Sequence, residues 1–113
     1  MSNVEVVRRG FTAFNDRLVD DLVALCDPLC EWVPFRAQLE GMVYRGHAGI
    51  RQFVRDMDED WETFRIDPSE FHERGALVGA VAHVSALGRG SGVRVASDAG
   101  FVFELRVDAI AFD

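Results

Sequence analysis

The segments LVGAVAHVSAL (residues 77–87) and VRVASDAGFVFELR (residues 93–106), joined by GRGSG (residues 88–92), decide the fold class of this 113-residue chain. Both long segments are rich in β-branched, aromatic and small apolar residues, and the glycines between them indicate a turn. In the second segment the odd positions are nearly all apolar, whereas the even positions include Arg94, Asp98 and Glu104. This alternation predicts a strand with one buried and one solvated face.

The segment Leu77–Leu87 differs because it is apolar on both alternating faces. A strand buried on both sides is unusual in so small a domain. We therefore expect one face to contact helices or a ligand, and the other to contact a second subunit. This pattern predicts a homodimer formed through the sheet.

The rest of the second half has the same strand-like character, broken by Pro68 and Gly75. Together with the two long segments it predicts an antiparallel meander. A single earlier strand is expected over Cys30–Phe35, with Pro34 at an edge or bulge, followed by a loop over Arg36–Arg45. The additional meander strands are predicted over Trp61–Ile66, Glu70–Arg74 and Ala109–Phe112.

Three helices are predicted before the meander. Apolar residues spaced three and four apart form one stripe over Val4–Leu18, and a shorter helix follows from Asp20 until Pro28 stops it. A third helix is predicted over His47–Met57, and the acidic run that follows Asp56 is expected to form a solvated turn. Helices followed by strands indicate an α+β fold, with the helices on one face of the sheet.

Composition excludes several classes of protein. The length predicts one domain over residues 1–113, and the net charge of −7 without a basic cluster argues against nucleic-acid binding. No apolar run approaches the length of a membrane span, and the first residues lack the features of a secretion signal, so we expect a cytoplasmic protein. Cys26 and Cys30 are expected to be reduced core residues, and we expect no metal and no cofactor.

The order of these elements resembles the SnoaL-like branch of the nuclear transport factor 2-like superfamily. The resemblance covers almost the whole chain, although the final strand of this chain has about half of the length that is usual in the family. It implies a curved, mixed, mostly antiparallel sheet that wraps the first helix as a cone and leaves an internal pocket, often in a homodimer. It is carried by Val6-Val7-Arg8-Arg9, Phe14-Asn15, Val23-Ala24-Leu25, Cys30-Glu31-Trp32, Tyr44-Arg45-Gly46-His47-Ala48-Gly49-Ile50 and Gly88-Arg89-Gly90-Ser91-Gly92.

The family includes enzymes, binding modules and members without known activity, so the resemblance does not fix a function. The ketosteroid isomerase pattern would place its tyrosine at Gly10, its general base at Pro34 and its second acid near Ala99, and none of these residues carries the required group. Epoxide hydrolases of the family need an Asp-Arg-Asp set, and this set cannot be assigned to Arg36, Arg94 and Asp98.

These observations predict a domain that binds a small apolar or aromatic molecule. Arg36 is expected at the pocket mouth, where it would pair with a carboxylate or enolate oxygen, although it also fits an ordinary surface position. The aromatic residues could equally be simple core. The residues expected to line the pocket are Trp32, Tyr44, Trp61, Phe64, Phe101 and Phe103.

Two alternatives remain open. His83, in the middle of an apolar strand, could serve an isomerase, lyase or hydrolase as acid or base together with a carboxylate such as Asp98 or Glu104. It could also be a histidine with only a structural hydrogen bond. The other alternative is a protein-interaction module, which predicts an interior without room for a ligand. Asp56, Asp58 and Asp60 have the spacing of calcium ligands, but Trp61 replaces the glycine that such a loop needs.

Overall fold

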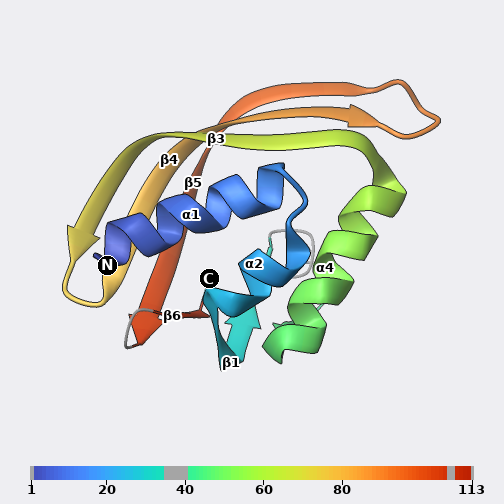
Figure 1. Cartoon of the computed structure of the whole chain (residues 1–113). Helices are drawn as coiled ribbons and strands as arrows, with labels where there is room; N and C mark the ends of the chain where they lie inside the picture. Colours follow the sequence, from blue (N-terminus) through green and yellow to red (C-terminus); the bar gives the residue numbers. More distant parts are fainter. Residues whose placement is uncertain (1, 35–40, 107–108, 113) are drawn as a thin grey trace.

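The computed structural model describes residues 2–34, 41–106 and 109–112, which form helices packed on one curved sheet (Figure 1). The elements are α1 (Asn3–Asn15), α2 (Val19–Ala24), β1 (Cys26–Trp32), β2 (Tyr44–Arg45), α4 (Gly46–Asp60), β3 (Trp61–Arg74), β4 (Leu77–Gly88), β5 (Arg94–Arg106) and β6 (Ala109–Phe112).

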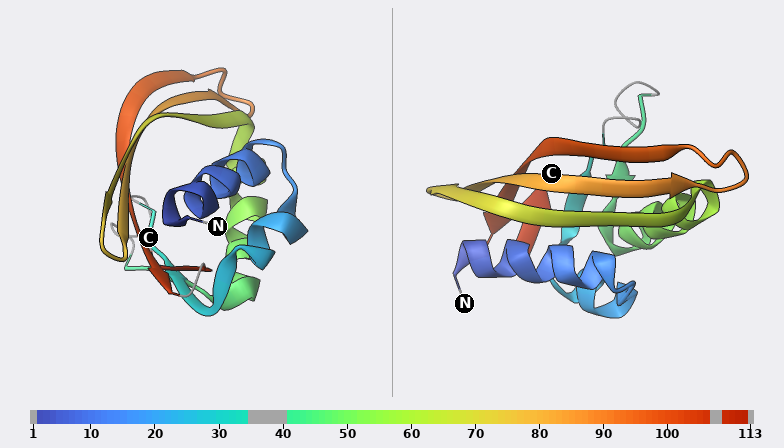
Figure 2. Two further views of the ribbon diagram at one scale, coloured as in Figure 1. Left: turned by 60° about the vertical axis from the view of Figure 1, so that its left-hand side comes forward. Right: turned by 90° about the horizontal axis from the view of Figure 1, so that it is seen from above.

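The six strands form one mixed sheet in the order β2-β1-β6-β5-β4-β3. All neighbouring strands are antiparallel except β1 and β6, which are parallel. The long strands β3, β4 and β5 lie side by side and curve over α1, while α2 and α4 stand beside β1 (Figures 1 and 2). The predicted α+β cone, with three helices on a mostly antiparallel sheet, is confirmed.

Helix α1 begins where predicted and ends earlier. The Ser2 side chain accepts a hydrogen bond from the Glu5 amide at its N-terminus, and the apolar stripe is buried against the sheet. The helix ends at Asn15 because Arg17 has a positive φ of 57°, a left-handed conformation typical of helix termini. Leu18, expected on the buried stripe, is therefore exposed.

Three strand boundaries differ from the prediction, two of them because proline does not end a strand at an edge or bulge. Strand β3 runs unbroken through Pro68, where its register with β4 shifts, and it is an edge strand. Strand β1 begins at Cys26, so Pro28 lies inside it, within the segment where the register with β6 shifts. The short β2 occupies the end of the predicted loop.

Helix α4 continues through the acidic run, which is not a turn. Three interactions from other elements hold its last residues. Arg17 pairs with Asp58 at 2.9 Å, the Arg89 guanidinium donates to the Asp58 carbonyl, and the Arg89 amide donates to the Asp60 carbonyl. A cation over helix-terminal carbonyls also favours the helix dipole, which offsets the repulsion expected from the acidic side chains.

Strand β4 buries one face within a single chain. Its even positions, including Val78, Ala80 and Ala82, are buried, whereas Leu77 is 46% exposed and Val81 is 36% exposed. Burial of both faces would therefore require a partner, so the homodimer stays a prediction. Val102 of the neighbouring β5, 59% exposed, extends this apolar surface.

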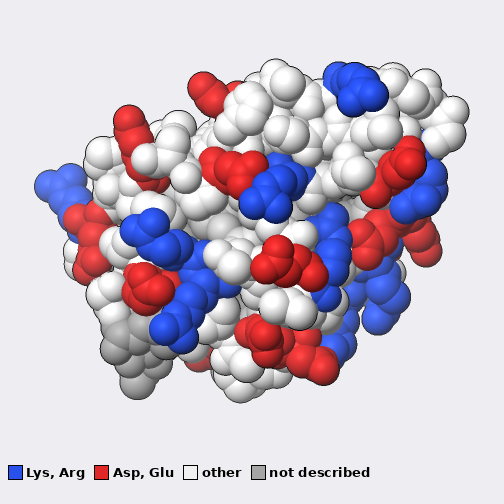
Figure 3. Space-filling view, turned by 45° about the horizontal axis from the view of Figure 1, so that its top comes forward, with Lys and Arg blue, Asp and Glu red and all other residues white. Residues whose placement is uncertain are grey.

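The burial of both cysteines agrees with the sequence analysis. Cys26 and Cys30 lie buried on β1 and form no disulfide. Acidic and basic side chains are interspersed over the face shown in Figure 3, where neither sign gathers into a patch. In the described ranges, no helix has the length and apolar character needed to span a membrane.

Candidate functional site

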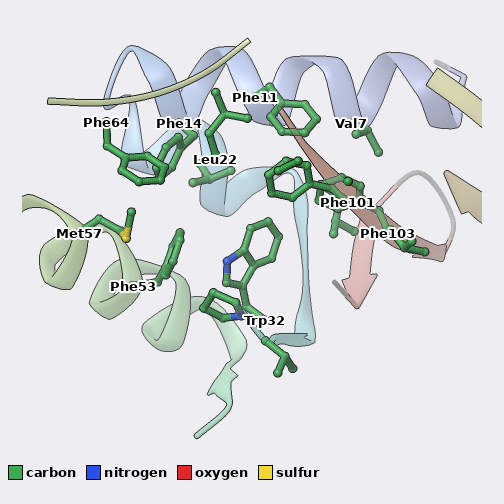
Figure 4. Close-up of a pocket in the computed structure, with 18 residues that line it drawn as sticks. Val7, Phe11, Phe14, Leu22, Trp32, Phe53, Met57, Phe64, Phe101 and Phe103 are labelled. Atoms are coloured by element: carbon green, nitrogen blue, oxygen red, sulfur yellow. The ribbon is translucent and has the colours of Figure 1, made fainter. Parts of the chain in front are cut away.

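A cavity of about 650 Å³ lies between the helices and the inner face of the sheet (Figure 4). This volume is in the range that holds one drug-sized molecule. Helices α1, α2 and α4 form one side, and β3, β5, β6 and the end of β1 form the other. The lining residues are Val7, Gly10, Phe11, Phe14, Leu22, Trp32, Val33, Pro34, Phe53, Met57, Phe64, Ile66, Ala99, Gly100, Phe101, Val102, Phe103 and Ile110.

The lining is chemically uniform. None of these described residues has an ionisable or hydroxyl-bearing side chain, and the Trp32 indole N–H is their one side-chain hydrogen-bond donor. Burying a charge or an unpaired polar group against such walls is costly, whereas burying hydrocarbon is favourable. The described walls therefore favour a largely apolar molecule and supply no side chain for proton transfer.

Aromatic side chains fix the shape of the cavity. The Phe11 ring on α1 meets Phe101 and Phe103 of β5 edge-on, each with ring centroids 5.6 Å apart. Trp32 bridges the two sides, 5.7 Å from Phe53 of α4 and 5.9 Å from Phe103. Edge-to-face and tilted pairs at these distances are favourable, so they hold the rings in place around the space that they enclose.

Polar contacts join the end of α1 to β3 and position the wall between them. The Asn15 side chain exchanges two hydrogen bonds with the Ile66 backbone, at 2.7 and 2.8 Å. Arg17 lies over the Phe14 ring and donates to the carbonyl oxygens of Phe14 and Phe64. Phe14, Phe64 and Ile66 all line the cavity, so this junction sets the separation of helix and strand there.

The structure separates the residues that the sequence analysis grouped as pocket aromatics. Trp32, Phe64, Phe101 and Phe103 line the cavity. Tyr44 packs edge-on against Phe53 from outside it and donates its hydroxyl to Asp56 at 2.6 Å, and Trp61 packs on Phe64 without reaching the lining. Arg36 lies outside the described residues.

His83 lies on the opposite face of the sheet from the cavity. Its side chain is 50% exposed, and its Nδ1 is 3.1 Å from Oδ1 of Asp98, directly across from it on β5. Asp67 of β3 is its neighbour on the other side. The expected carboxylate partner is thus present, but a catalytic role for His83 would require a substrate on this outer face.

The cavity also uses residues that the sequence analysis assigned only to helix cores. Val7, Phe11 and Phe14 belong to the predicted stripe of α1, and Phe53 and Met57 belong to that of α4. The stripe was their signal, but periodicity does not distinguish a side chain packed in a core from one at a cavity wall.

Three positions singled out by the family resemblance meet at this cavity. Gly10, Pro34 and Ala99, where a ketosteroid isomerase would carry its tyrosine, base and second acid, all belong to the lining. The family resemblance thus points to the wall of this cavity, although the residues at these three positions lack the groups that an isomerase uses. Outside the pocket, no cluster of three possible metal ligands occurs among the residues that the structure describes.

Comparison with known proteins places the fold. Residues 7–112 match the family model of the SnoaL-like domain, while no curated protein matches the chain. TerC, co-crystallised with polyporic acid, is 24% identical with a TM-score of 0.85, and the alignment covers 97% of this chain and 86% of TerC.

Two further solved structures have the same fold. A candidate polyketide cyclase from Pseudomonas putida KT2440 is 20% identical with a TM-score of 0.82, covering 99% of this chain and 88% of its own. A protein of ketosteroid isomerase-like fold from Catenulispora acidiphila DSM 44928, in complex with trimethylamine, is 17% identical with a TM-score of 0.85, covering 96% and 81%. With a family match over residues 7–112, the chain belongs to the SnoaL-like domain family.

Proposed function

We propose that this domain binds one small, flat, largely apolar or aromatic molecule in the cavity between α1, α4 and β5. The observation that carries the proposal is the cavity of about 650 Å³, whose described walls consist of hydrocarbon and aromatic groups. The ligands held by TerC and by the Catenulispora protein support a binding role for this fold. A cavity of this size argues against an interaction module with a closed interior.

The first test is native mass spectrometry of the purified protein, followed by release and identification of any small molecule that accompanies it. A bound aromatic or aliphatic compound is the expected result. A matched pair of tryptophans then locates binding, because Trp32 lines the cavity and Trp61 does not. A ligand should change the emission of Trp61→Phe, which keeps Trp32, more than that of Trp32→Phe. The opposite order would contradict binding in this cavity.

The proposal is for binding rather than for catalysis by side chains of the wall. The isomerase, lyase or hydrolase alternative relies on His83 and Asp98, which face away from the cavity. It is tested by His83→Ala, since a binding domain should retain full affinity for its ligand in this variant. Turnover of a released ligand that is lost in His83→Ala would favour the enzyme instead.

We also propose that the domain forms a homodimer, in which a second copy of this chain binds to the outer face of β4 and β5. Leu77, Val81 and Val102 are exposed apolar side chains on that face. Val81→Asp should convert a dimer to a monomer in sedimentation analysis, because burying an unpaired carboxylate is costly. Leu29→Asp is the matched control, since Leu29 is 80% exposed on β1, which β6 separates from β5 in the sheet. A wild-type chain that stays monomeric at high concentration would refute the dimer.

The cytoplasm is the location that we propose. The buried cysteines Cys26 and Cys30, which form no disulfide, support it, because cysteines stay reduced in reducing compartments.

A further inference from the structure

His83 lies in the middle of the outer face of the sheet, on the surface through which we propose that two copies associate. Residues directly opposite each other on antiparallel strands share a face, so His83 lies between Asp98 of β5 and Asp67 of β3. The exposed apolar side chain of Val81 is two residues earlier on the same face of β4. A partner that covers Val81 would therefore also cover His83.

The charges around His83 come from both neighbouring strands. On β5, Asp98 Oδ1 lies 3.1 Å from the His83 Nδ1, and within the described residues His83 is the one ion-pairing partner of Asp98. On β3, Asp67 pairs with Arg65 at 2.8 Å, and Glu70 adds a further carboxylate one position along the same face. The uncharged neighbours on this face are Val81, Ser85, Ala96 and Gly100.

The protonation state of His83 decides the balance of charge in this row. The carboxylates of Asp67 and Asp98 face the one guanidinium of Arg65, so the row has a net charge of −1 while His83 is neutral and of zero once it is protonated. An isologous dimer brings the same row from both copies to the interface, so an unbalanced charge occurs there twice.

Covering Asp98 removes water from its carboxylate, and that loss is costly unless a positive charge compensates for it. A neutral imidazole offers only a hydrogen bond, whereas a protonated imidazole offers an ion pair. Both the repulsion between the two rows and the cost of covering Asp98 therefore fall when His83 gains a proton.

From this arrangement we infer that protonation of His83 beside Asp98 strengthens the homodimer, so that the two copies associate more tightly in mildly acidic solution. This inference rests on the homodimer proposed above and adds its regulation. Histidine changes its charge between about pH 5 and pH 8 in proteins. Because the dimer holds this proton more tightly than the monomer, its stability is highest below that range and falls as the pH rises through it.

Sedimentation velocity of the wild-type chain at about pH 5.5 and about pH 8 tests the inference, because these values lie near the two ends of the histidine range. The dissociation constant of the dimer should be roughly ten- to hundredfold smaller at the lower pH. A tenfold gain in proton affinity on association counts once for each of the two copies, which sets this scale.

Three variants assign the effect to the pair. His83→Gln keeps a polar side chain but cannot become charged, so its dimer should respond little to pH. His72→Gln is the matched control, because His72 is on the same outer face, on the edge strand and 73% exposed, and it should keep the wild-type response. Asp98→Asn removes the carboxylate that needs compensation, so its dimer should be tight at both pH values. A purely structural role of His83 would instead weaken the dimer of His83→Gln equally at both.

The outcomes separate this inference from the dimer itself. A wild-type chain that stays monomeric at both pH values contradicts the homodimer. A dimer whose affinity is independent of pH, or that weakens in acid, overturns the role of His83 alone. An unchanged pH response in His83→Gln, or a response lost in His72→Gln instead, overturns it equally.

Discussion

Asn15 is a single side chain that joins the helical layer to the edge of the sheet. Its Nδ2 donates to the Ile66 carbonyl at 2.7 Å, and its Oδ1 accepts from the Ile66 amide at 2.8 Å. Ile66 lies on the edge strand β3, so these backbone groups have no ladder partner on that side. Asn15 therefore replaces a missing neighbouring strand, and we predict that Asn15→Ala destabilises the fold.

The magnitude follows from the two bonds. An unsatisfied buried donor or acceptor costs about 1–3 kcal/mol, and partial solvation of this half-buried junction places each loss at the lower end. Losing both gives about 2 kcal/mol, a substantial part of the roughly 5–15 kcal/mol that stabilises a domain of this size. With a urea m-value of roughly 2 kcal/mol/M, the unfolding midpoint should fall by about 1 M.

Urea unfolding followed by far-ultraviolet circular dichroism measures this shift. Asn3→Ala is the control, because the Asn3 side chain makes no described hydrogen bond, and its effect should stay within about 0.5 kcal/mol. Asn15→Asp keeps the acceptor but faces the Ile66 carbonyl with a second oxygen, so it should also destabilise at neutral pH and recover partly in acid, where the carboxyl donates. A midpoint for Asn15→Ala equal to that of the control would refute the reasoning.

Three further predictions concern single positions. A Cβ at Gly49 would lie 2.8 Å from the Tyr44 carbonyl carbon, so Gly49→Ala should lower the free energy of unfolding by about 1–3 kcal/mol in urea titration, although alanine favours helices. A Cβ at Gly10 would meet only the Ile110 side chain, at 3.4 Å, so Gly10→Ala should raise the melting temperature through a helix-propensity gain of up to about 1 kcal/mol. Burial raises the pKa of the Cys30 thiol, so the native state keeps this proton to higher pH than the unfolded state; stability should fall as pH rises above the ordinary value of 9.0, and Cys30→Ala should flatten that decline in urea midpoints measured across pH.

The fold was predictable because its main signals are local. The alternation in Val93–Arg106 fixed which face of β5 is buried, and the stripe of α1 fixed the face of that helix. Pro68 was misleading for a reason that is not local. Proline interrupts an interior strand but is tolerated on an edge, and the position of β3 in the sheet is decided by pairing over the whole chain.

The candidate site was only partly predictable because a cavity depends on the volume that side chains fail to fill. Tyr44 and Phe53 have similar apolar rings, yet Phe53 reaches the cavity and Tyr44 packs outside it. The placement of His83 needed strand register, since the apolar pattern of β4 on both faces gave no indication of the side on which the helices lie.

Gly10, Pro34 and Ala99 link the shape of the cavity to its chemistry, because all three lie at its wall. Ionisable or hydroxyl groups at these positions would project into the cavity and could act on a bound molecule, as the family resemblance implies for the isomerases. The glycine, proline and alanine found at these wall positions have no side-chain group that could transfer a proton. Open internal space costs packing energy, so larger apolar side chains that filled the cavity would stabilise the domain. The cavity instead keeps about 650 Å³, and the ligand that we propose would restore the missing contacts and stabilise the folded state by binding to it.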